Sequence, residues 1–404
     1  MSSGETFPMA RAAKCPFAPA PALTRRPPVS RVRLWDGSEP WLITGYAEVR
    51  AVLADPRVSV DVAQPGFPHT NAVSKARDAR MKTLMQMDPP EHTAQRRILA
   101  PEFTVRKMAA LRPRVQEIVD DLLGQLLAGP SPADLVEAFA LPLPSLVICE
   151  LLGVPYADRG FFQNVARTLV MDDPDPARAV AASEELNAYL EDLAAAGPGL
   201  LGKLSGSMPP REIAVLGQLL LVAGHDTTAA MIALGTAVLL THPEQFRASS
   251  ADPTEELLRY LSITHTEARR VALADLEIGG QLIRAGEGII AVKSTANRDP
   301  LAFPEPDRFD VRRPARHHVA FGYGRHLCLG APLARLELEI AYSTLRRVPG
   351  LALAVPLDRL EFKENAIFYS VRELPVTWAS TFTTVPPGSS TKNRRTPHDS
   401  SVSG

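Results

Sequence analysis

The chain has 404 residues, with 44 Lys and Arg against 45 Asp and Glu, so its formal net charge is −1. This balance argues against a nucleic-acid-binding protein, which usually carries a marked basic excess. The three cysteines, Cys15, Cys149 and Cys328, are odd in number and far apart, which excludes a disulfide framework and a four-cysteine metal cluster.

The first half of the chain is predicted to change from irregular structure to helices. Residues 1–30 are rich in Pro and Ala and lack the apolar stretch of a secretory signal. Residues 31–60 predict short strands followed by a helix. Residues 90–245 place apolar side chains at three- and four-residue spacing, which predicts a long series of helices.

The second half is predicted to contain the remaining strands. Residues 270–295 favour strands joined by a turn at Gly279 and Gly280. Residues 332–347 predict a helix, and residues 351–377 predict short closing strands.

No linker divides the predicted elements. We therefore expect residues 1–380 to form one domain, mainly α with small β-sheets. Residues 381–404 have almost no large apolar side chains, which predicts a disordered tail. The longest uncharged apolar run, residues 227–241, is too short for a membrane span, so we expect no membrane partner.

A glycine-rich loop around Cys328 is the most informative segment. Gly322, Gly324 and Gly330 permit a tight loop whose backbone N–H groups point at the sulfur. Pro332 suits the first turn of the helix that follows. Cys328 should therefore lie just before a helix N-terminus, which lowers a thiol pKa and favours a metal-binding thiolate. A buried core cysteine is the alternative.

The loop resembles the haem-binding signature of the cytochrome P-450 family. The matching residues are Phe321-Gly322-x-Gly324-x-His326-x-Cys328-x-Gly330, continued by Ala331, Leu333, Ala334, Arg335 and Glu337. The resemblance implies haem b as cofactor and Cys328 as the axial thiolate ligand of its iron. It also implies the family fold, with the haem between a distal central helix and the proximal cysteine loop.

The apolar segment 211–241 predicts an unusually long helix that crosses a core. Its midpoint nevertheless carries Gly224, Asp226 and Thr227. A Thr hydroxyl can bond to the carbonyl four residues back, and the glycine leaves room for a small molecule. A polar notch satisfied by neighbouring helices is the alternative.

This midpoint, Ala223-Gly224-x-Asp226-Thr227-Thr228, resembles the distal-helix motif of the same family. The resemblance implies that Thr227 hydrogen-bonds dioxygen, the co-substrate, and that Asp226 helps to deliver protons. Ala223 and Gly224 would then adjoin the haem.

Glu256 and Arg259 lie three residues apart and share one helix face. By position they resemble the family's structural Glu–Arg pair, for which Arg308 is the expected third member. An ordinary surface pair is the alternative.

Four basic residues match family positions that hold the haem propionates. They are His92, Arg96, Arg270 and His326. The alternatives are solvated surface charges for the two arginines and a capping or loop histidine for His92.

The resemblance also implies a substrate pocket of low charge. Its candidate residues are Val222, Ala223, Thr264, Thr266, Lys293, Ile367 and Phe368. We therefore expect a haem-thiolate monooxygenase that hydroxylates or epoxidises a bulky apolar small molecule, such as a natural product or a xenobiotic.

The chain most resembles the soluble bacterial, actinomycete-type branch of the family. It is also similar to the fungal nitric oxide reductase branch. That branch usually lacks the acid and alcohol that correspond to Asp226 and Thr227, and it binds NADH through basic residues. Residues 58–68 here hold no Lys or Arg, which favours oxygen activation. A nitric oxide reductase or peroxygenase remains one alternative, and a non-catalytic haem-binding sensor another.

We expect no fused flavin or iron–sulfur domain after the last predicted strand. The resemblance therefore implies a separate ferredoxin and ferredoxin reductase, with electrons ultimately from NAD(P)H. Arg97, Arg106, Lys107 and Arg325 could meet an acidic partner. We expect a cytoplasmic protein and a monomer.

Overall fold

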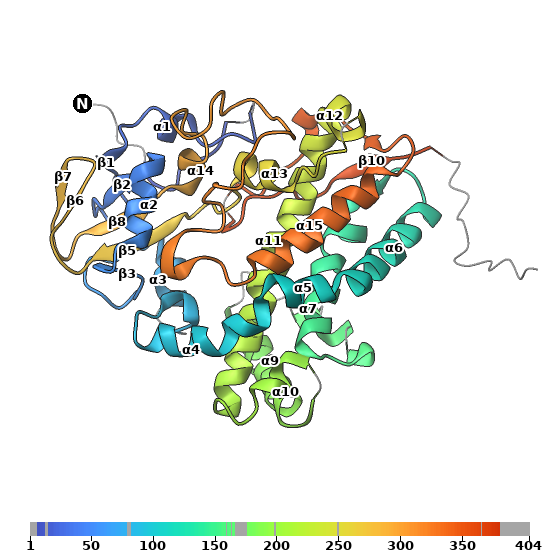
Figure 1. The fold of residues 1–404 in the computed structure, drawn as a ribbon, viewed down its shortest axis with the longest axis horizontal. Coiled ribbons are helices and arrows are strands. Elements are labelled where there is room, and N and C mark those ends of the chain that lie inside the picture. The colour runs from blue at the N-terminus through green and yellow to red at the C-terminus, as the bar shows by residue number, and fades with distance from the viewer. Residues whose placement is uncertain are drawn as a thin grey trace, which may run out of the picture.

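The computed structural model describes residues 6–12, 15–78, 82–158, 160–162, 164–165, 176–197, 199–248, 250–364 and 366–379. The predicted disordered tail, residues 381–404, lies outside them. Most strands gather at one side of the molecule, and the long helices fill the other side (Figure 1).

Helices dominate the described residues, as the sequence predicted. The α-helices are α1 Pro21–Thr24, α2 Tyr46–Ala54, α3 Ala72–Asp78, α4 Glu91–Leu99, α5 Val105–Ala110, α6 Arg112–Ala128, α7 Pro142–Leu152, α9 Pro176–Ala196, α10 Gly199–Leu204, α11 Pro210–Thr241, α12 Pro243–Ala248, α13 Thr254–Leu261, α14 Lys293–Ala296 and α15 Ala331–Arg346. Shorter helical turns are η1 Leu84–Gln86, η2 Ala100–Phe103, η3 Val136–Ala140, η4 Tyr156–Asp158, η5 Gly324–His326 and η6 Leu357–Arg359. The mainly α fold class with small sheets is confirmed.

The strands form three small sheets. The largest has the order β1-β2-β8-β5-β3 and consists of β1 Val29–Arg31, β2 Trp41–Ile43, β3 Val58–Ser59, β5 Ala268–Ala272 and β8 Gly288–Ala291. In this sheet β2 and β8 are parallel, and the other neighbours are antiparallel. The second sheet contains β4 Ala133–Asp134, β9 Ala352–Leu353 and β10 Pro375–Thr377, and the third contains β6 Leu276–Ile278 and β7 Gln281–Ile283.

The turn between β6 and β7 is the one that the glycine pair predicted. Gly279 and Gly280 have φ of 55° and 73°, a region that favours residues without a side chain. The predicted closing strands are much shorter than residues 351–377, because β9 lies between Pro349 and Pro356. Proline cannot donate a hydrogen bond to a neighbouring strand.

Helix α11 runs through the helical part and contacts α7, α9 and α15. It is long and apolar enough to cross a membrane by length and composition, yet it is mostly buried within the protein. An all-round apolar helix of this kind requires neighbours on every face. At Gly235 an added Cβ would lie 2.1 Å from the hydroxyl oxygen of Tyr342, so this glycine lets α15 approach closely.

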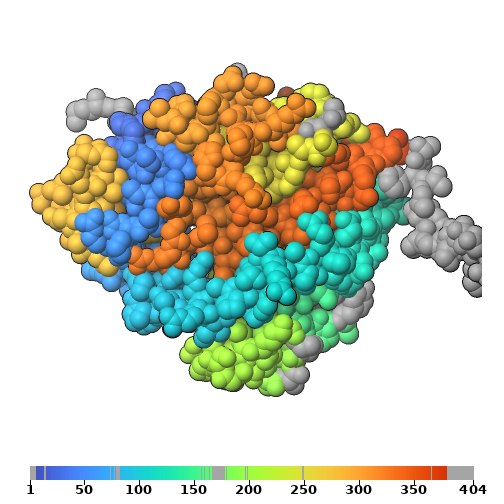
Figure 2. All heavy atoms as spheres, viewed as in Figure 1, coloured from blue at the N-terminus to red at the C-terminus, as the bar shows by residue number. Residues whose placement is uncertain are grey.

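The loop that leads into α15 lies beside the helices α4 to α6. In the space-filling view these helices form a cyan strip directly beneath the orange segment that precedes α15 (Figure 2). This arrangement brings residues near 92–96 to the cysteine loop, more than two hundred residues later in the chain.

Candidate functional site

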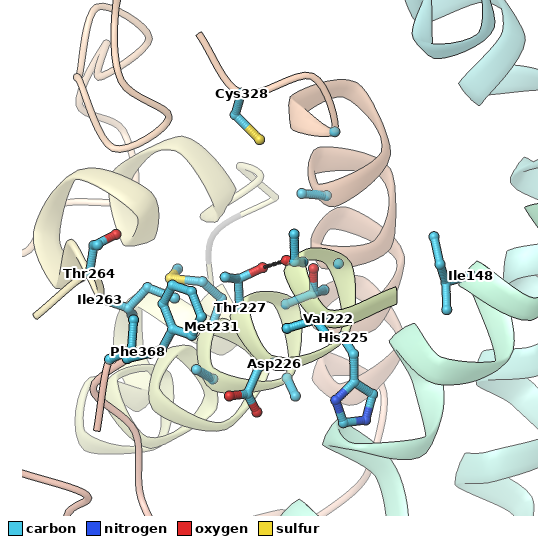
Figure 3. Close-up of a pocket in the computed structure, with 18 of the residues that line it drawn as sticks. Ile148, Val222, His225, Asp226, Thr227, Met231, Ile263, Thr264, Cys328 and Phe368 are labelled. Carbon is cyan, nitrogen blue, oxygen red and sulfur yellow. Dashed lines mark hydrogen bonds between the residues drawn. The ribbon is translucent and has the colours of Figure 1, made fainter. Parts of the chain in front are cut away.

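A large cavity separates α11 from the loop that precedes α15. Its volume is about 2060 Å³, well above the roughly 300–1,000 Å³ of an ordinary ligand pocket. Cys328 lies on one side of the cavity and Thr227, on α11, lies across from it (Figure 3). A cavity of this size has room for a large cofactor and for a second molecule beside it.

The cysteine loop adopts the tight form that its glycines predicted. Gly322 and Gly324 have φ of 77° and 72°. A Cβ at Gly324 would lie 2.5 Å from the carbonyl oxygen of Leu53, so only glycine lets the loop pack against the end of α2. The backbone N–H of Cys328 donates to the carbonyl oxygen of Phe321 at 2.9 Å, which closes the loop.

Cys328 lies two residues before Gly330, the N-cap of α15, so its predicted place is confirmed. Gly330 itself has φ −78°, and a Cβ there would lie 4.0 Å from the Cys328 sulfur. Cys328 is accessible from the cavity that it lines, although the surrounding protein encloses its thiol.

The predicted lowering of the Cys328 pKa is wrong for the protein alone. Burial raises the pKa of this thiol, while the N–H groups of Gly330 and Ala331 and the cations Lys293 and Arg96 act in the opposite direction. Burial outweighs the helix terminus, since a thiolate is poorly solvated at this depth. A metal cation against the sulfur would reverse the balance by stabilising the thiolate.

Four basic side chains line the cavity near the cysteine loop. The rings of His92 and His326 lie with their centroids 4.2 Å apart. Arg96 donates to the carbonyl oxygen of Leu327 at 2.7 Å, and Arg270 donates to a backbone carbonyl at 2.7 Å. Within the described residues none of the four forms an ion pair.

This concentration of positive charge disfavours further protonation. Burial, followed by the charge of Arg270, lowers the pKa of His326 to about 3, and burial lowers the pKa of Arg270 to about 10. The Nε2 atom of His326 is buried without a hydrogen-bond partner in the described structure. A ligand that carries carboxylates would satisfy these groups. Together with the single thiol, they fit an iron porphyrin with its two propionates.

Helix α11 forms the opposite wall of the cavity. Thr227 donates from its hydroxyl to the carbonyl oxygen of Ala223 at 2.7 Å, as predicted. A Cβ at Gly224 would meet only Ile148, at 3.7 Å, so the space beside this glycine is open. Figure 3 shows Thr227 nearer to Cys328, whereas Asp226 points away from the cysteine at the flank of the helix.

The residues predicted to face a substrate meet in the same cavity. Those that line it are Val222, Ala223, Thr264, Thr266, Lys293, Ile367 and Phe368. Thr264 and Phe368 form an isolated antiparallel bridge, which joins two segments about a hundred residues apart. The fold brings these two segments together, and their separation in the sequence alone could not show this contact.

The pair of Glu256 and Arg259 is fully buried. Arg259 donates to both carboxylate oxygens of Glu256, at 2.7 and 2.8 Å, and to the carbonyl oxygens of Asn297 and Pro306. This satisfied network fixes α13 against the segment that follows α14. The alternative of an ordinary surface pair is therefore wrong.

The predicted third member, Arg308, is wrong. Its side chain is 63% exposed and pairs with Glu305. Arg313 takes the place instead, because its Nε lies 3.2 Å from Glu256 and its side chain is only 11% exposed. The chain turns between these residues, and sequence proximity did not show which arginine faces inward.

Sequence reasoning named Arg335 and Glu337 only as part of the haem-binding signature, and it missed the network around Glu255 and the burial of Glu337. Burial alone would raise the pKa of Glu255, but contacts with His318 and Arg335 outweigh it and lower the pKa to about 2. Glu337 lines the cavity from α15, and burial raises its pKa to about 8. Its spacing of four residues from Leu333 could have indicated an inward face.

Comparison with known proteins gives a consistent result. A model of the cytochrome P450 family matches residues 254–347. Cytochrome P450-SU2 from Streptomyces griseolus is 48% identical over 92% of this chain and 97% of its own length.

Solved structures agree along nearly the whole chain. The crystal structure of GfsF superposes with a TM-score of 0.87 at 47% identity, over 92% of this chain and all of that one. The mycinamicin VIII C21 methyl hydroxylase MycCI from Micromonospora griseorubida, bound to mycinamicin VIII, gives 0.83 at 38% identity, with coverage of 92% and 100%.

Proposed function

The chain is a cytochrome P450 monooxygenase of the bacterial, actinomycete type, and from this premise we propose the roles of its own residues and the class of its substrate. Members of this family hold haem and use dioxygen with electrons from a reductant. We propose that the group here is haem b and that Cys328 supplies its axial thiolate. When bound, the haem supplies the chemistry that activates dioxygen.

His92, Arg96, Arg270 and His326 would hold the two haem carboxylates. Support comes from their position along one part of the cavity and from the absence of ion pairs to them within the described residues. Each carboxylate would gain charge-assisted hydrogen bonds and would relieve the repulsion between the basic groups.

Thr227 and Asp226 would manage protons on the opposite wall. The Thr227 hydroxyl has a single proton, which it now donates to the carbonyl oxygen of Ala223 at 2.7 Å. Its oxygen can therefore accept a hydrogen bond from the cavity, and rotation about χ1 would let it donate there instead. Asp226 would carry protons toward Thr227 from the flank of α11.

The substrate would be a bulky, largely apolar small molecule, either a natural product or a xenobiotic. The observation that carries this proposal is the cavity of about 2060 Å³ between Cys328 and α11. The similarity to a hydroxylase solved with mycinamicin VIII supports the same size class. The product would be a hydroxylated or epoxidised form of the substrate.

A separate ferredoxin and ferredoxin reductase would deliver electrons from NAD(P)H. Arg97, Arg106, Lys107 and Arg325 would meet an acidic partner, although Lys107 already pairs with Glu102 at 2.6 Å. We propose that the protein works in the cytoplasm as a monomer.

The test is reconstituted turnover. The holoprotein is screened for substrates by the change in haem absorption, and hits are incubated with ferredoxin, ferredoxin reductase, NADPH and isotopically labelled dioxygen. We expect one labelled oxygen atom in the product. Substrate-independent reduction of nitric oxide by NADH without a ferredoxin would contradict the proposal.

A matched pair of variants tests the role of the hydroxyl. Thr227→Ala should keep substrate binding but lower product formed per NADPH, with more hydrogen peroxide released. Thr241→Ala is the control, because Thr241 makes a similar bond to the carbonyl oxygen of Val238 at 2.8 Å at the end of the same helix. An equal amount of product per NADPH in the two variants would refute the role of Thr227.

A further inference from the structure

Lys293 places a cation inside the wall of an otherwise mainly apolar cavity. It begins α14 one residue after β8, whose four residues are all buried, and its side chain lines the cavity. Burial lowers the pKa of Lys293, and Glu267 opposes this effect. Because an ammonium is costly to remove from water, a buried lysine normally has a counter-charge within reach.

The charge of Glu267 favours the ammonium, but the Glu267 carboxylate makes its hydrogen bonds to the main chain and not to the Lys293 side chain. Glu267 accepts the backbone N–H of Lys293 at 2.8 Å and the backbone N–H of Ser294 at 3.2 Å, one on each carboxylate oxygen. Burial raises the pKa of Glu267, which weakens it further as a counter-charge. Glu267 therefore fixes the start of α14 through the main chain.

The Lys293 ammonium has one hydrogen-bond partner within the described residues. It donates to the hydroxyl oxygen of Thr264 at 3.2 Å and forms no ion pair there. An ammonium has three N–H donors, so two remain for another acceptor. The Thr264 hydroxyl, which accepts from Lys293, still has its own proton to donate.

The position of Thr264 places this pair on the substrate side of the cavity. Thr264 bridges to Phe368, and Figure 3 shows Thr264, Ile263 and Phe368 grouped together, with Met231 next to them and Thr227 beyond it. The haem carboxylates already have four other proposed partners, one of which, Arg270, is close enough for its charge to act on Lys293. The Lys293–Thr264 pair is therefore available to a molecule that lies next to α11.

We propose that Lys293 and Thr264 bind a carboxylate on the substrate, so that this enzyme selects apolar molecules that carry an acid group. This inference rests on the proposed function and adds the chemical class of its substrate. The ammonium would pair with one carboxylate oxygen, and the Thr264 hydroxyl would donate to the other. The acid end would thus be held at the cavity edge, and the apolar remainder would extend over the reactive centre.

The experiment uses probes that need no knowledge of the natural substrate. Imidazolyl alkanoic acids of increasing chain length bind haem iron through the imidazole, and their carboxylate-terminated chains extend different distances into the cavity. Each acid is compared with its methyl ester by titration of the haem absorption band. We expect the acid of fitting length to bind about tenfold to a hundredfold more tightly than its ester.

Three variants assign this preference. Lys293→Met should reduce the acid-to-ester ratio to within about threefold, and Lys293→Gln should do the same while it keeps a polar side chain. Thr264→Val should lower the ratio less. Lys82→Met is the matched control, because Lys82 is an exposed lysine that pairs with Asp61 and Glu91 outside the cavity.

Each result has a defined meaning. The inference is overturned if the wild type shows no acid preference at any chain length, or if the preference survives Lys293→Met and Lys293→Gln. Loss of haem from both variants would also overturn it, since Lys293 would then hold the cofactor. Failure of the proposed function is distinguishable, because it would appear in the separate turnover assay with ferredoxin, ferredoxin reductase and labelled dioxygen, whereas the acid-to-ester ratio needs only ligand binding to the haem.

Discussion

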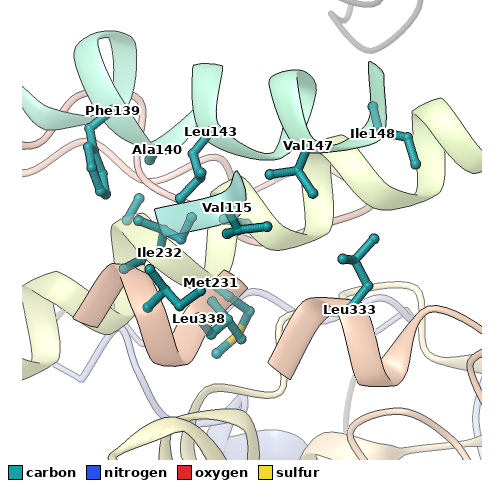
Figure 4. Close-up of a cluster of buried hydrophobic side chains, with 14 of the residues drawn as sticks. Val115, Phe139, Ala140, Leu143, Val147, Ile148, Met231, Ile232, Leu333 and Leu338 are labelled. Atoms are coloured by element: carbon teal, nitrogen blue, oxygen red, sulfur yellow. The ribbon is translucent and has the colours of Figure 1, made fainter. Parts of the chain in front are cut away.

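Glu337 is a carboxyl group buried among apolar side chains. Leu333 and Leu338 on α15 belong to the main hydrophobic core, and Figure 4 shows Leu338 beside Met231 of α11. Only 3% of Glu337 is exposed, and its Oε2 atom has no hydrogen-bond partner in the described structure. Burial raises the pKa of Glu337 from 4.5 to about 8. We predict that Glu337→Gln removes a strong pH dependence of stability.

The sign follows from proton linkage. The folded protein holds the proton of the Glu337 carboxyl more tightly than the unfolded chain does. The contribution of this proton to the free energy of unfolding is therefore most favourable below pH 4.5. It is lost as the pH rises toward 8. Integrated between pH 5 and pH 8, the loss is roughly 3–4 kcal/mol in order of magnitude. The glutamine variant cannot ionise and should therefore gain stability relative to the wild type by about this amount over the same interval.

The assay is equilibrium urea unfolding of wild type and variant at several pH values between 5 and 8. Glu339→Gln is the matched control, since Glu339 lies on the same helix but is exposed and pairs with Arg112. This control should change the free energy of unfolding by less than about 1 kcal/mol. Parallel pH profiles for wild type and Glu337→Gln would refute the reasoning.

Two further predictions concern buried packing. Arg313→Ala should destabilise the protein by roughly 2–4 kcal/mol, because it removes an ion pair to buried Glu256. Arg308 is exposed, so Arg308→Ala should destabilise the protein by less than about 1 kcal/mol. Thermal or urea unfolding compares the two variants. In an exposed helix, replacing glycine by alanine would stabilise the protein by up to about 1 kcal/mol. Gly235→Ala should instead destabilise the protein by roughly 1–3 kcal/mol, because the new Cβ would lie 2.1 Å from the Tyr342 hydroxyl oxygen. A measured gain in stability for this variant would show that α15 can shift aside.

The sequence predicted the features that depend on neighbouring residues. The glycines before Cys328 and the Thr227 hydroxyl act within one loop or one helical turn, so their geometry is local. The long helix α11 was also predictable, since its apolar run is continuous. Its observed limits, Pro210–Thr241, agree within one residue.

Features that depend on long-range packing were predicted less well. Arg308 and Arg313 lie five residues apart, and only the path of the loop decides which of them reaches Glu256. The Cys328 pKa depends on how deeply the fold buries the sulfur, and this effect exceeded the local influence of the helix terminus. Burial is therefore the quantity that sequence reasoning estimated worst.

The proposed roles of all the other site residues depend on Cys328 binding haem iron as a thiolate. The most direct test is the absorption spectrum of the reduced, carbon-monoxide-treated holoprotein. We expect the strongly red-shifted band of thiolate-ligated haem in the wild type and its loss in Cys328→Ala. Retention of that band by the variant, or failure of the wild-type protein to take up haem at all, would contradict it.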